Sequence, residues 1–226
     1  MSVLRSLAFY GVFYAGTLLL LVIAPFQGAH GMRRLAGTWS AFHRWCVRHI
    51  LRVRVITEGG PIDGPALYAM RHESFFEAID APCVFGSPVI FAKQELLDLP
   101  VWGKAAATYG IIPVARSDGA KALRDLMRAA KGAKAEGRAF LIFPEGTRTP
   151  HGEEGPIVSG FAGLYKLLDL PVVPVAVNSG PLYRDLVKRK GQITYRFGTP
   201  IEPGLGRKEV EAQVREAINA LQPSAR

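Results

Sequence analysis

Residues 139–148 have the sequence AFLIFPEGTR, five apolar residues followed at once by a short polar loop. An apolar run of this length that ends in a turn is typical of a buried strand in a parallel sheet. Pro144 and Gly146 shape the turn, and Arg148 supplies a fixed cationic fork suited to phosphate. We expect Glu145 either to position a substrate hydroxyl or to hold Arg148. A solvated turn with an incidental ion pair would explain the same residues.

Apolar runs of the same kind recur on both sides of this stretch. Helical periodicity separates several of them, most clearly over residues 119–136 and 207–221. Strands that alternate with helices indicate an α/β domain with a largely parallel sheet flanked by helices, which we assign to residues 53–226. The other predicted strands cover residues 53–55, 66–70, 89–92, 111–114, 172–177 and 193–197.

The first 52 residues have a different character. Residues 6–32 contain no Asp, Glu, Lys or Arg, and residues 7–26 are almost continuously apolar. About 20 residues of helix span roughly 30 Å, the thickness of the hydrocarbon core of a bilayer. A secretory signal peptide is the alternative, but the segment before the apolar run offers only Arg5 and no clear cleavage site follows. We therefore predict a hydrophobic, membrane-associated helical element over residues 1–52.

A second helix is expected over residues 33–51. One face carries apolar residues at helical spacing, and arginines recur every four residues on another side. Such a helix either lies in the membrane interface or packs on the soluble core, and the pattern fits both equally. Basic residues flank the apolar segment at Arg5 and at Arg33 and Arg34, which favours a re-entrant hairpin with both flanks on the cytoplasmic face of the cell membrane.

Charge and composition narrow the function further. The net charge of +9 indicates anionic partners such as a membrane surface or a phosphorylated substrate. A nucleic-acid binder would explain the charge but not the apolar N-terminus. The two cysteines, Cys46 and Cys83, are far apart, so a disulfide framework or zinc ribbon is not expected. Phosphate-binding P-loop, dinucleotide-binding, zinc-protease and serine-hydrolase signatures do not occur in the sequence.

A histidine next to acidic residues follows the predicted strand at residues 66–70. His72 precedes Glu77 by five residues and Asp80 by eight. If a helix begins near Ser74, the Glu77 carboxylate falls in its first turn and is expected to reach back to the imidazole. A base held by a carboxylate is the arrangement that removes a proton from a hydroxyl. Ser74 is itself either a nucleophile or, as we prefer, the helix N-cap.

The order of these motifs resembles the PlsC-like 1-acyl-glycerol-3-phosphate acyltransferase family of glycerolipid synthesis. Four sequence blocks carry the resemblance, and together they span about half the chain. They are HESFFE at residues 72–77, GIIPVAR at 110–116, FPEGTR at 143–148 and VVPV at 172–175. Two positions depart from the family pattern. Its aspartate five residues after the histidine is Glu77 here, and its acidic residue before the arginine of the second block is Ala115.

The resemblance implies an enzyme that transfers a fatty acyl group to lysophosphatidic acid and makes phosphatidic acid. It implies His72 as general base, oriented by Glu77, and a phosphate-binding set made of Arg116, Glu145, Gly146, Thr147 and Arg148. The acyl thioester of coenzyme A or acyl carrier protein would be the co-substrate, with no metal or other cofactor required. Two alternatives stay open: another lysolipid as acceptor, such as a lyso-ornithine lipid, or a non-catalytic module that binds anionic lipids.

Overall fold

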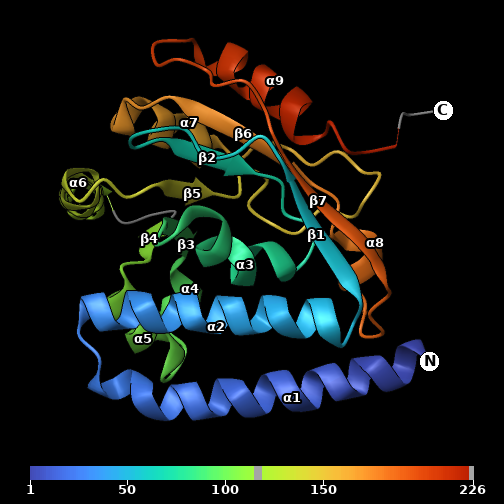
Figure 1. The fold of residues 1–226 in the computed structure, drawn as a ribbon. Coiled ribbons are helices and arrows are strands. Elements are labelled where there is room, and N and C mark those ends of the chain that lie inside the picture. The colour runs from blue at the N-terminus through green and yellow to red at the C-terminus, as the bar shows by residue number, and fades with distance from the viewer. Residues whose placement is uncertain (115–118, 224–226) are drawn as a thin grey trace.

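Seven strands form one sheet at the centre of the molecule (Figure 1). The computed structural model describes residues 1–114 and 119–223. The strands are β1 (Val53–Glu58), β2 (Leu67–Met70), β3 (Val89–Lys93), β4 (Ile112–Val114), β5 (Phe140–Ile142), β6 (Val172–Val177) and β7 (Gly191–Phe197). Their order is β1-β7-β6-β2-β5-β3-β4, and every pair is parallel except β6 with β7. The predicted α/β class with a largely parallel sheet is therefore confirmed.

Successive side chains of a strand point to opposite faces of the sheet, and here the side chains on both faces are apolar. Helices therefore cover both faces. Leu67 and Ala69 of β2 belong to the core under α7 (Ser159–Leu168) and α9 (Arg207–Ile218). Tyr68 and Met70 belong to the core on the opposite face. That second core packs against α1 (Ser2–Ile23), α2 (Ala29–His49), α3 (Phe76–Phe85) and α8 (Gly180–Tyr183). The remaining helices are η1 (Ala24–Phe26), α4 (Gln94–Leu97), α5 (Trp102–Tyr109) and α6 (Gly119–Ala135).

The two N-terminal helices form an antiparallel layer below the sheet in Figure 1. On one side, α2 packs on α3 through an ion pair between Arg44 and the buried Asp80, with an Nε–Oδ1 distance of 2.8 Å. On its other side, α2 packs on α1, where the ring nitrogen of Trp39 donates to Thr17 at 3.0 Å. The second helix therefore packs on the core, as one of its two alternatives predicted, and its other side contacts the apolar helix α1.

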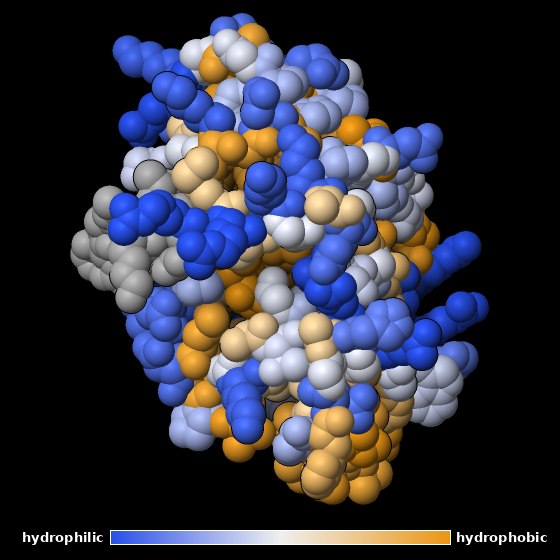
Figure 2. Space-filling view, turned by 90° about the vertical axis from the view of Figure 1, so that its left-hand side faces the viewer, coloured by the Kyte–Doolittle hydropathy of each residue, from blue (hydrophilic) through white to orange (hydrophobic). Residues whose placement is uncertain are grey.

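The outer face of α1 stays exposed and apolar. The segment Ser2–Phe26 is long and apolar enough to cross a membrane. An 18-residue stretch within it has a mean hydropathy of 2.2, and only 17% of that stretch is buried. Figure 2 shows hydrophobic residues gathered at the lower end of the molecule, where α1 lies. This surface is consistent with membrane association. The large side chains exposed on it include Leu4, Leu7, Leu18, Leu19, Val22 and Phe26.

Candidate active site

His72 lies just beyond the end of β2, and the loop after β5 lies directly beside it. β2 and β5 are parallel neighbours, so their carboxyl ends meet at one edge of the sheet. Two hydrogen bonds join the segments: the amide of His72 donates to Oε2 of Glu145 at 2.9 Å, and the amide of Thr149 donates to the carbonyl of His72 at 2.8 Å. The first and third predicted blocks therefore form one site.

The imidazole of His72 is packed against an aromatic ring and is half-buried. Its ring stacks on Phe143, with centroids 4.0 Å apart and an interplanar angle of 26°. Nδ1 is buried and has no hydrogen-bond partner among the described residues. Burial, followed by the positive charge of Arg148, lowers the pKa of His72 to about 3. The imidazole is therefore neutral at physiological pH and has a lone pair available to accept a proton.

The predicted hydrogen bond between Glu77 and His72 is not found. The buried Glu77 carboxylate accepts hydrogen bonds from the amides of Glu73 (2.8 Å) and Ser74 (3.2 Å) and from Oγ of Ser179 (2.7 Å). Ser74 Oγ in turn accepts from the amide of Phe76 at 3.1 Å. The reason is local: Ser74 and Glu77 are spaced as a capping box, so the carboxylate turns back to orphan amides at the helix start. Glu77 thus fixes the backbone that follows His72 rather than the imidazole itself.

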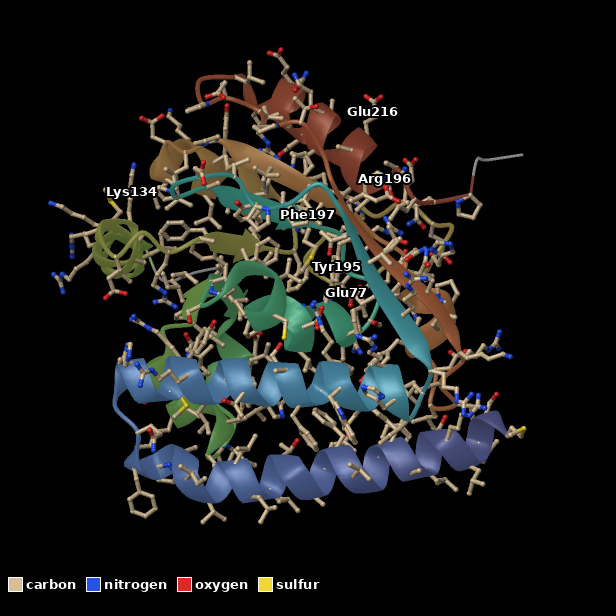
Figure 3. All side chains as sticks on the ribbon, in the orientation of Figure 1. Glu77, Lys134, Tyr195, Arg196, Phe197 and Glu216 are labelled. Atoms are coloured by element: carbon tan, nitrogen blue, oxygen red, sulfur yellow. The ribbon has the colours of Figure 1, made fainter. Side chains whose placement is uncertain are left out.

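Asp80, the other carboxylate considered, also lies away from His72. It pairs with Arg44 of α2 and accepts a hydrogen bond from the hydroxyl of Tyr195 at 3.0 Å. Figure 3 shows Glu77 and Tyr195 together in the space between α3 and the sheet. Asp80 is fully buried, so its ion pair with Arg44 attaches the N-terminal helices to the α/β part of the chain.

Glu145 is a buried positioning group, and it holds neither Arg148 nor an exposed hydroxyl site. Only 2% of its surface is exposed. Besides accepting from the His72 amide, it pairs with Nη1 of Arg71 at 3.2 Å. Arg71 is fully buried, directly before His72, and five oxygen partners match its five N–H groups. These partners are Glu73 and Glu145, the carbonyls of Pro150 and Glu153, and the side chain of Asn219.

This buried network extends to the C-terminal part of the chain, and the sequence motifs do not predict it. Glu73 pairs with Nδ1 of His151 at 2.9 Å and accepts from Nε2 of Gln222 at 2.9 Å and the amide of Gly180 at 2.7 Å. The sequence signal that was available is Arg71 itself, an arginine directly after an apolar strand, since a buried arginine requires several acceptors. Nothing local in the sequence indicates that Asn219 and Gln222 reach this place.

Arg148 lies at the surface beside His72. Its guanidinium stacks on the exposed ring of Phe75, with Cζ 4.0 Å from the ring centroid. Gly146 adopts a positive φ of +66°, and a Cβ there would come within 2.9 Å of Val158, so the turn requires glycine. Thr147 is exposed next to it. Arg116, the remaining predicted phosphate ligand, lies outside the described residues.

Comparisons with known proteins show the family to which the chain belongs. The sequence profile of the Acyltransferase family matches residues 47–178. The 1-acyl-sn-glycerol-3-phosphate acyltransferase of Pseudomonas aeruginosa is 31% identical over 186 residues, which cover 78% of this chain and 72% of that protein. The chain belongs to the acyltransferase family. The protein of the same name from Helicobacter pylori is 32% identical over 119 residues, covering 51% of this chain and 50% of that protein.

The structure of a known acyltransferase shares the fold of this chain. The structure of the 1-acyl-sn-glycerophosphate acyltransferase PlsC from Thermotoga maritima superimposes with a TM-score of 0.72. It covers 96% of this chain and 92% of that chain, at 20% sequence identity. The similarity therefore includes the N-terminal helices as well as the sheet. Within this acyltransferase, the family match covers His72, Glu77 and the turn of residues 145–148.

The ionisation of Glu77 gives a testable dependence of stability on pH. Burial raises the pKa of this carboxyl from 4.5 to about 7, against the hydrogen bonds that lower it. Because the folded state binds this proton more tightly, the stabilisation is complete below about pH 4.5 and is lost as the pH rises through about 7. We expect the free energy of unfolding of the wild type to fall over this range relative to that of Glu77→Gln, which carries no titrating proton. Urea unfolding in detergent at several pH values measures it, and a difference between the two proteins that is independent of pH would contradict it.

Proposed function

We propose that this acyltransferase transfers a fatty acyl group from an acyl thioester to the free hydroxyl of lysophosphatidic acid, and so makes phosphatidic acid. The observation that carries the proposal is the neutral His72 at the end of β2, beside the cationic Arg148. A hydroxyl needs a base, and a phosphomonoester needs a cation a few ångströms away. The relatives from P. aeruginosa and H. pylori carry the name of this activity.

The reaction needs one base and no covalent enzyme intermediate. His72 accepts the proton of the acceptor hydroxyl while the oxygen attacks the thioester carbonyl carbon, giving a tetrahedral oxyanion. When the intermediate collapses, the C–S bond breaks, and the imidazolium returns its proton to the departing thiolate. The donor is the thioester of coenzyme A or acyl carrier protein, which is already activated. Ser74 and Ser179, the serines nearest Glu77, are buried and hydrogen-bonded to each other at 2.7 Å, which disfavours either as a nucleophile.

The phosphate of the acceptor is assigned to the turn after β5. Arg148 offers a guanidinium held in place by the ring of Phe75, so its orientation costs little entropy on binding. Thr147 provides a hydroxyl donor beside it, and Gly146, whose amide already donates to the carbonyl of Phe143 at 3.0 Å, gives the turn its shape. Arg116 completes the set by resemblance to the family. Holding the phosphate in this way brings the hydroxyl to His72, which turns binding energy into orientation.

We place the enzyme at the cytoplasmic face of the cell membrane. Its acceptor is a lipid, and the exposed apolar face of α1 provides a means of reaching it. Arg5 before the apolar segment and Arg33 and Arg34 after it favour cytoplasmic flanks, where acyl thioesters are also made available.

A product assay tests the function. Purified protein in detergent is offered lysophosphatidic acid, other lysophospholipids and a lyso-ornithine lipid, each with acyl-coenzyme A and with acyl carrier protein. The diacyl product is then identified by mass spectrometry. We expect phosphatidic acid to form fastest. A faster reaction with another lysolipid would change the acceptor, and no product from any pair would favour the non-catalytic alternative.

Arg148→Ala should impair the use of the acceptor much more than that of the donor. A charge-assisted contact to phosphate is worth about 1.5–3 kcal/mol, so the apparent KM for lysophosphatidic acid should rise tenfold or more. Arg148→Lys keeps the charge without the planar fork, so its KM for lysophosphatidic acid should lie between those of the wild type and Arg148→Ala. Initial rates at varied concentrations of each substrate measure it. A rise only in the KM of the thioester would assign Arg148 to the donor site.

A further inference from the structure

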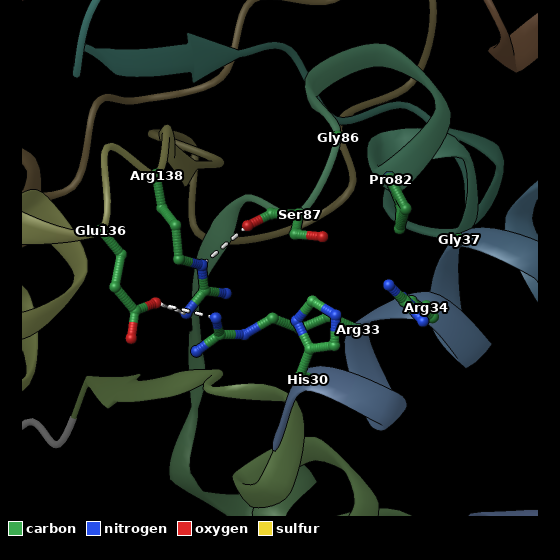
Figure 4. Close-up of a pocket in the computed structure, with 9 residues that line it drawn as sticks. All are labelled: His30, Arg33, Arg34, Gly37, Pro82, Gly86, Ser87, Glu136 and Arg138. Atoms are coloured by element: carbon green, nitrogen blue, oxygen red, sulfur yellow. Dashed lines mark hydrogen bonds and ion pairs between the residues drawn. The ribbon is translucent and has the colours of Figure 1, made fainter. Parts of the chain in front are cut away.

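A basic cavity of about 400 Å³ lies at the edge of the sheet opposite His72 (Figure 4). Its lining comes from the start of α2, the end of α3 and the segments that lead into β3 and β5. His72 and Glu145 follow their strands, whereas Ser87 and Arg138 precede theirs, so the cavity is separate from the candidate active site. We call it the arginine pocket, after Arg33, Arg34 and Arg138, which line it together with Gly37, Ser87 and Glu136.

The charges in the arginine pocket are unbalanced. One oxygen of Glu136 serves both Arg33, at 2.8 Å, and Arg138, at 4.0 Å. Arg34 is exposed and has no ion pair among the described residues. The three arginines and the one glutamate of the lining therefore leave an excess of two positive charges. Such an excess in a half-enclosed basin attracts an anion.

Two of the guanidinium groups are already positioned. Nε of Arg138 donates to the carbonyl of Ser87 at 2.8 Å, and its Nη2 donates to that of Pro88 at 3.3 Å. Nε of Arg33 is buried and has no hydrogen-bond partner among the described residues. Burial and the neighbouring charge of Arg33 lower the pKa of Arg138, as expected for like charges held together. Figure 4 shows Arg33 and Arg138 meeting from α2 and from the segment before β5.

Gly37 keeps one side of the arginine pocket open. It lies inside α2, where glycine costs about 1 kcal/mol relative to alanine. A Cβ at this position would meet no atom within 4 Å, so packing does not require a glycine. Gly37 lines the pocket, so the open space beside its Cα belongs to the pocket. A large side chain at position 37 would therefore fill the pocket without changing its charge.

The position of the arginine pocket favours a lipid as the source of the anion. The apolar segment ends at Phe26, which is 83% exposed, and His30 of the pocket follows four residues later. A helix that lies in the interface places the residues next to its end at headgroup depth. Figure 2 views this side and shows hydrophilic residues directly above the apolar lower end. Basic pockets in this setting bind the headgroups of anionic lipids.

We propose that the arginine pocket binds the phosphate of an anionic phospholipid, at a site distinct from that of the acyl acceptor. Arg34 and Arg33 donate to the phosphate oxygens, and Ser87 adds a hydroxyl donor at the rim. A lipid held there fixes how the protein lies on the membrane, because the pocket and the apolar face of α1 engage the same leaflet. The proposal rests on the membrane association of α1 and does not depend on which lysolipid is acylated.

The test measures lipid binding to the purified full-length protein in neutral detergent by native mass spectrometry. Phosphatidylglycerol is the probe, because it is neither acceptor nor product in the proposed reaction. We expect the wild type to retain one phosphatidylglycerol in preference to phosphatidylcholine. Arg34→Gln, which breaks no ion pair, and Gly37→Leu, which keeps every charge, should each weaken this binding about tenfold or more.

Arg48→Gln is the matched control, because it removes the same charge from the exposed last turn of the same helix, outside the pocket. It should bind as the wild type does. Weakening by Arg48→Gln as large as that by Arg34→Gln would overturn the site in favour of general surface charge. Full binding by Gly37→Leu would overturn the pocket. Displacement of the lipid by millimolar inorganic phosphate would overturn the lipid source in favour of a soluble phosphate.

Discussion

Replacing His72 with alanine should lower the rate of acyl transfer by about a hundred- to ten-thousand-fold. The imidazole is the neutral base at the end of β2, and its Nδ1 makes no hydrogen bond among the described residues. Without it, the acceptor hydroxyl must lose its proton to water, and the departing thiolate lacks a proton donor. Initial rates with lysophosphatidic acid and an acyl thioester measure the loss.

Two further variants make this result interpretable. His72→Gln keeps much of the volume that packs on Phe143. Its free energy of unfolding should therefore be close to that of the wild type, while the protein is inactive. His49→Ala removes an exposed histidine from the last turn of α2 and should leave the rate unchanged. A His72→Gln protein that is folded and turns over at a near-normal rate would exclude general-base catalysis by this residue.

Replacing Glu145 with alanine should destabilise the protein by about 3–5 kcal/mol, because the change leaves part of a buried ion-pair network uncompensated. Arg71 would lose one of its two carboxylates, and the amide of His72 would lose its acceptor. Urea unfolding in detergent measures the change. Glu154→Ala, an exposed position in the same loop, should change stability by no more than about 0.5 kcal/mol.

Glu145→Gln separates positioning from substrate contact. The amide keeps the shape and one acceptor but removes the charge, so the loop that carries His72 should loosen. We expect kcat to fall while the KM for lysophosphatidic acid changes little, because the carboxylate is buried and fully engaged. A rise in KM alone, with kcat intact, would mean that Glu145 contacts the acceptor after all.

The sequence predicted the sheet well because burial on both faces leaves a strong local signal. The runs at residues 66–70, 139–143 and 172–177 correspond to β2, β5 and β6, each within one residue at either end. The same signal predicted that the loops after β2 and β5 carry the site. Helices whose periodicity is short were missed, including α5 and α7, because eight to ten residues give too few turns to establish a face.

The connections within the site were harder to predict. Glu77 was expected to hold His72, yet Ser74 and Glu77 form a capping arrangement that is readable from their spacing and that takes the carboxylate away. Glu145 was predicted to bind the substrate, yet its carboxylate pairs with the buried Arg71. Asn219 reaches Arg71 across 148 residues, and no local pattern encodes such a contact.

The most direct test of acyl transfer without a covalent enzyme intermediate is the release of free thiol from acyl-coenzyme A. It is followed with a thiol reagent in the presence and absence of lysophosphatidic acid. Direct transfer to the acceptor hydroxyl predicts that thiol appears only when lysophosphatidic acid is present, with one thiol released for each phosphatidic acid formed. The mass of the protein should stay unchanged throughout. Thiol released without an acceptor, together with an acyl group attached to the protein, would contradict the account.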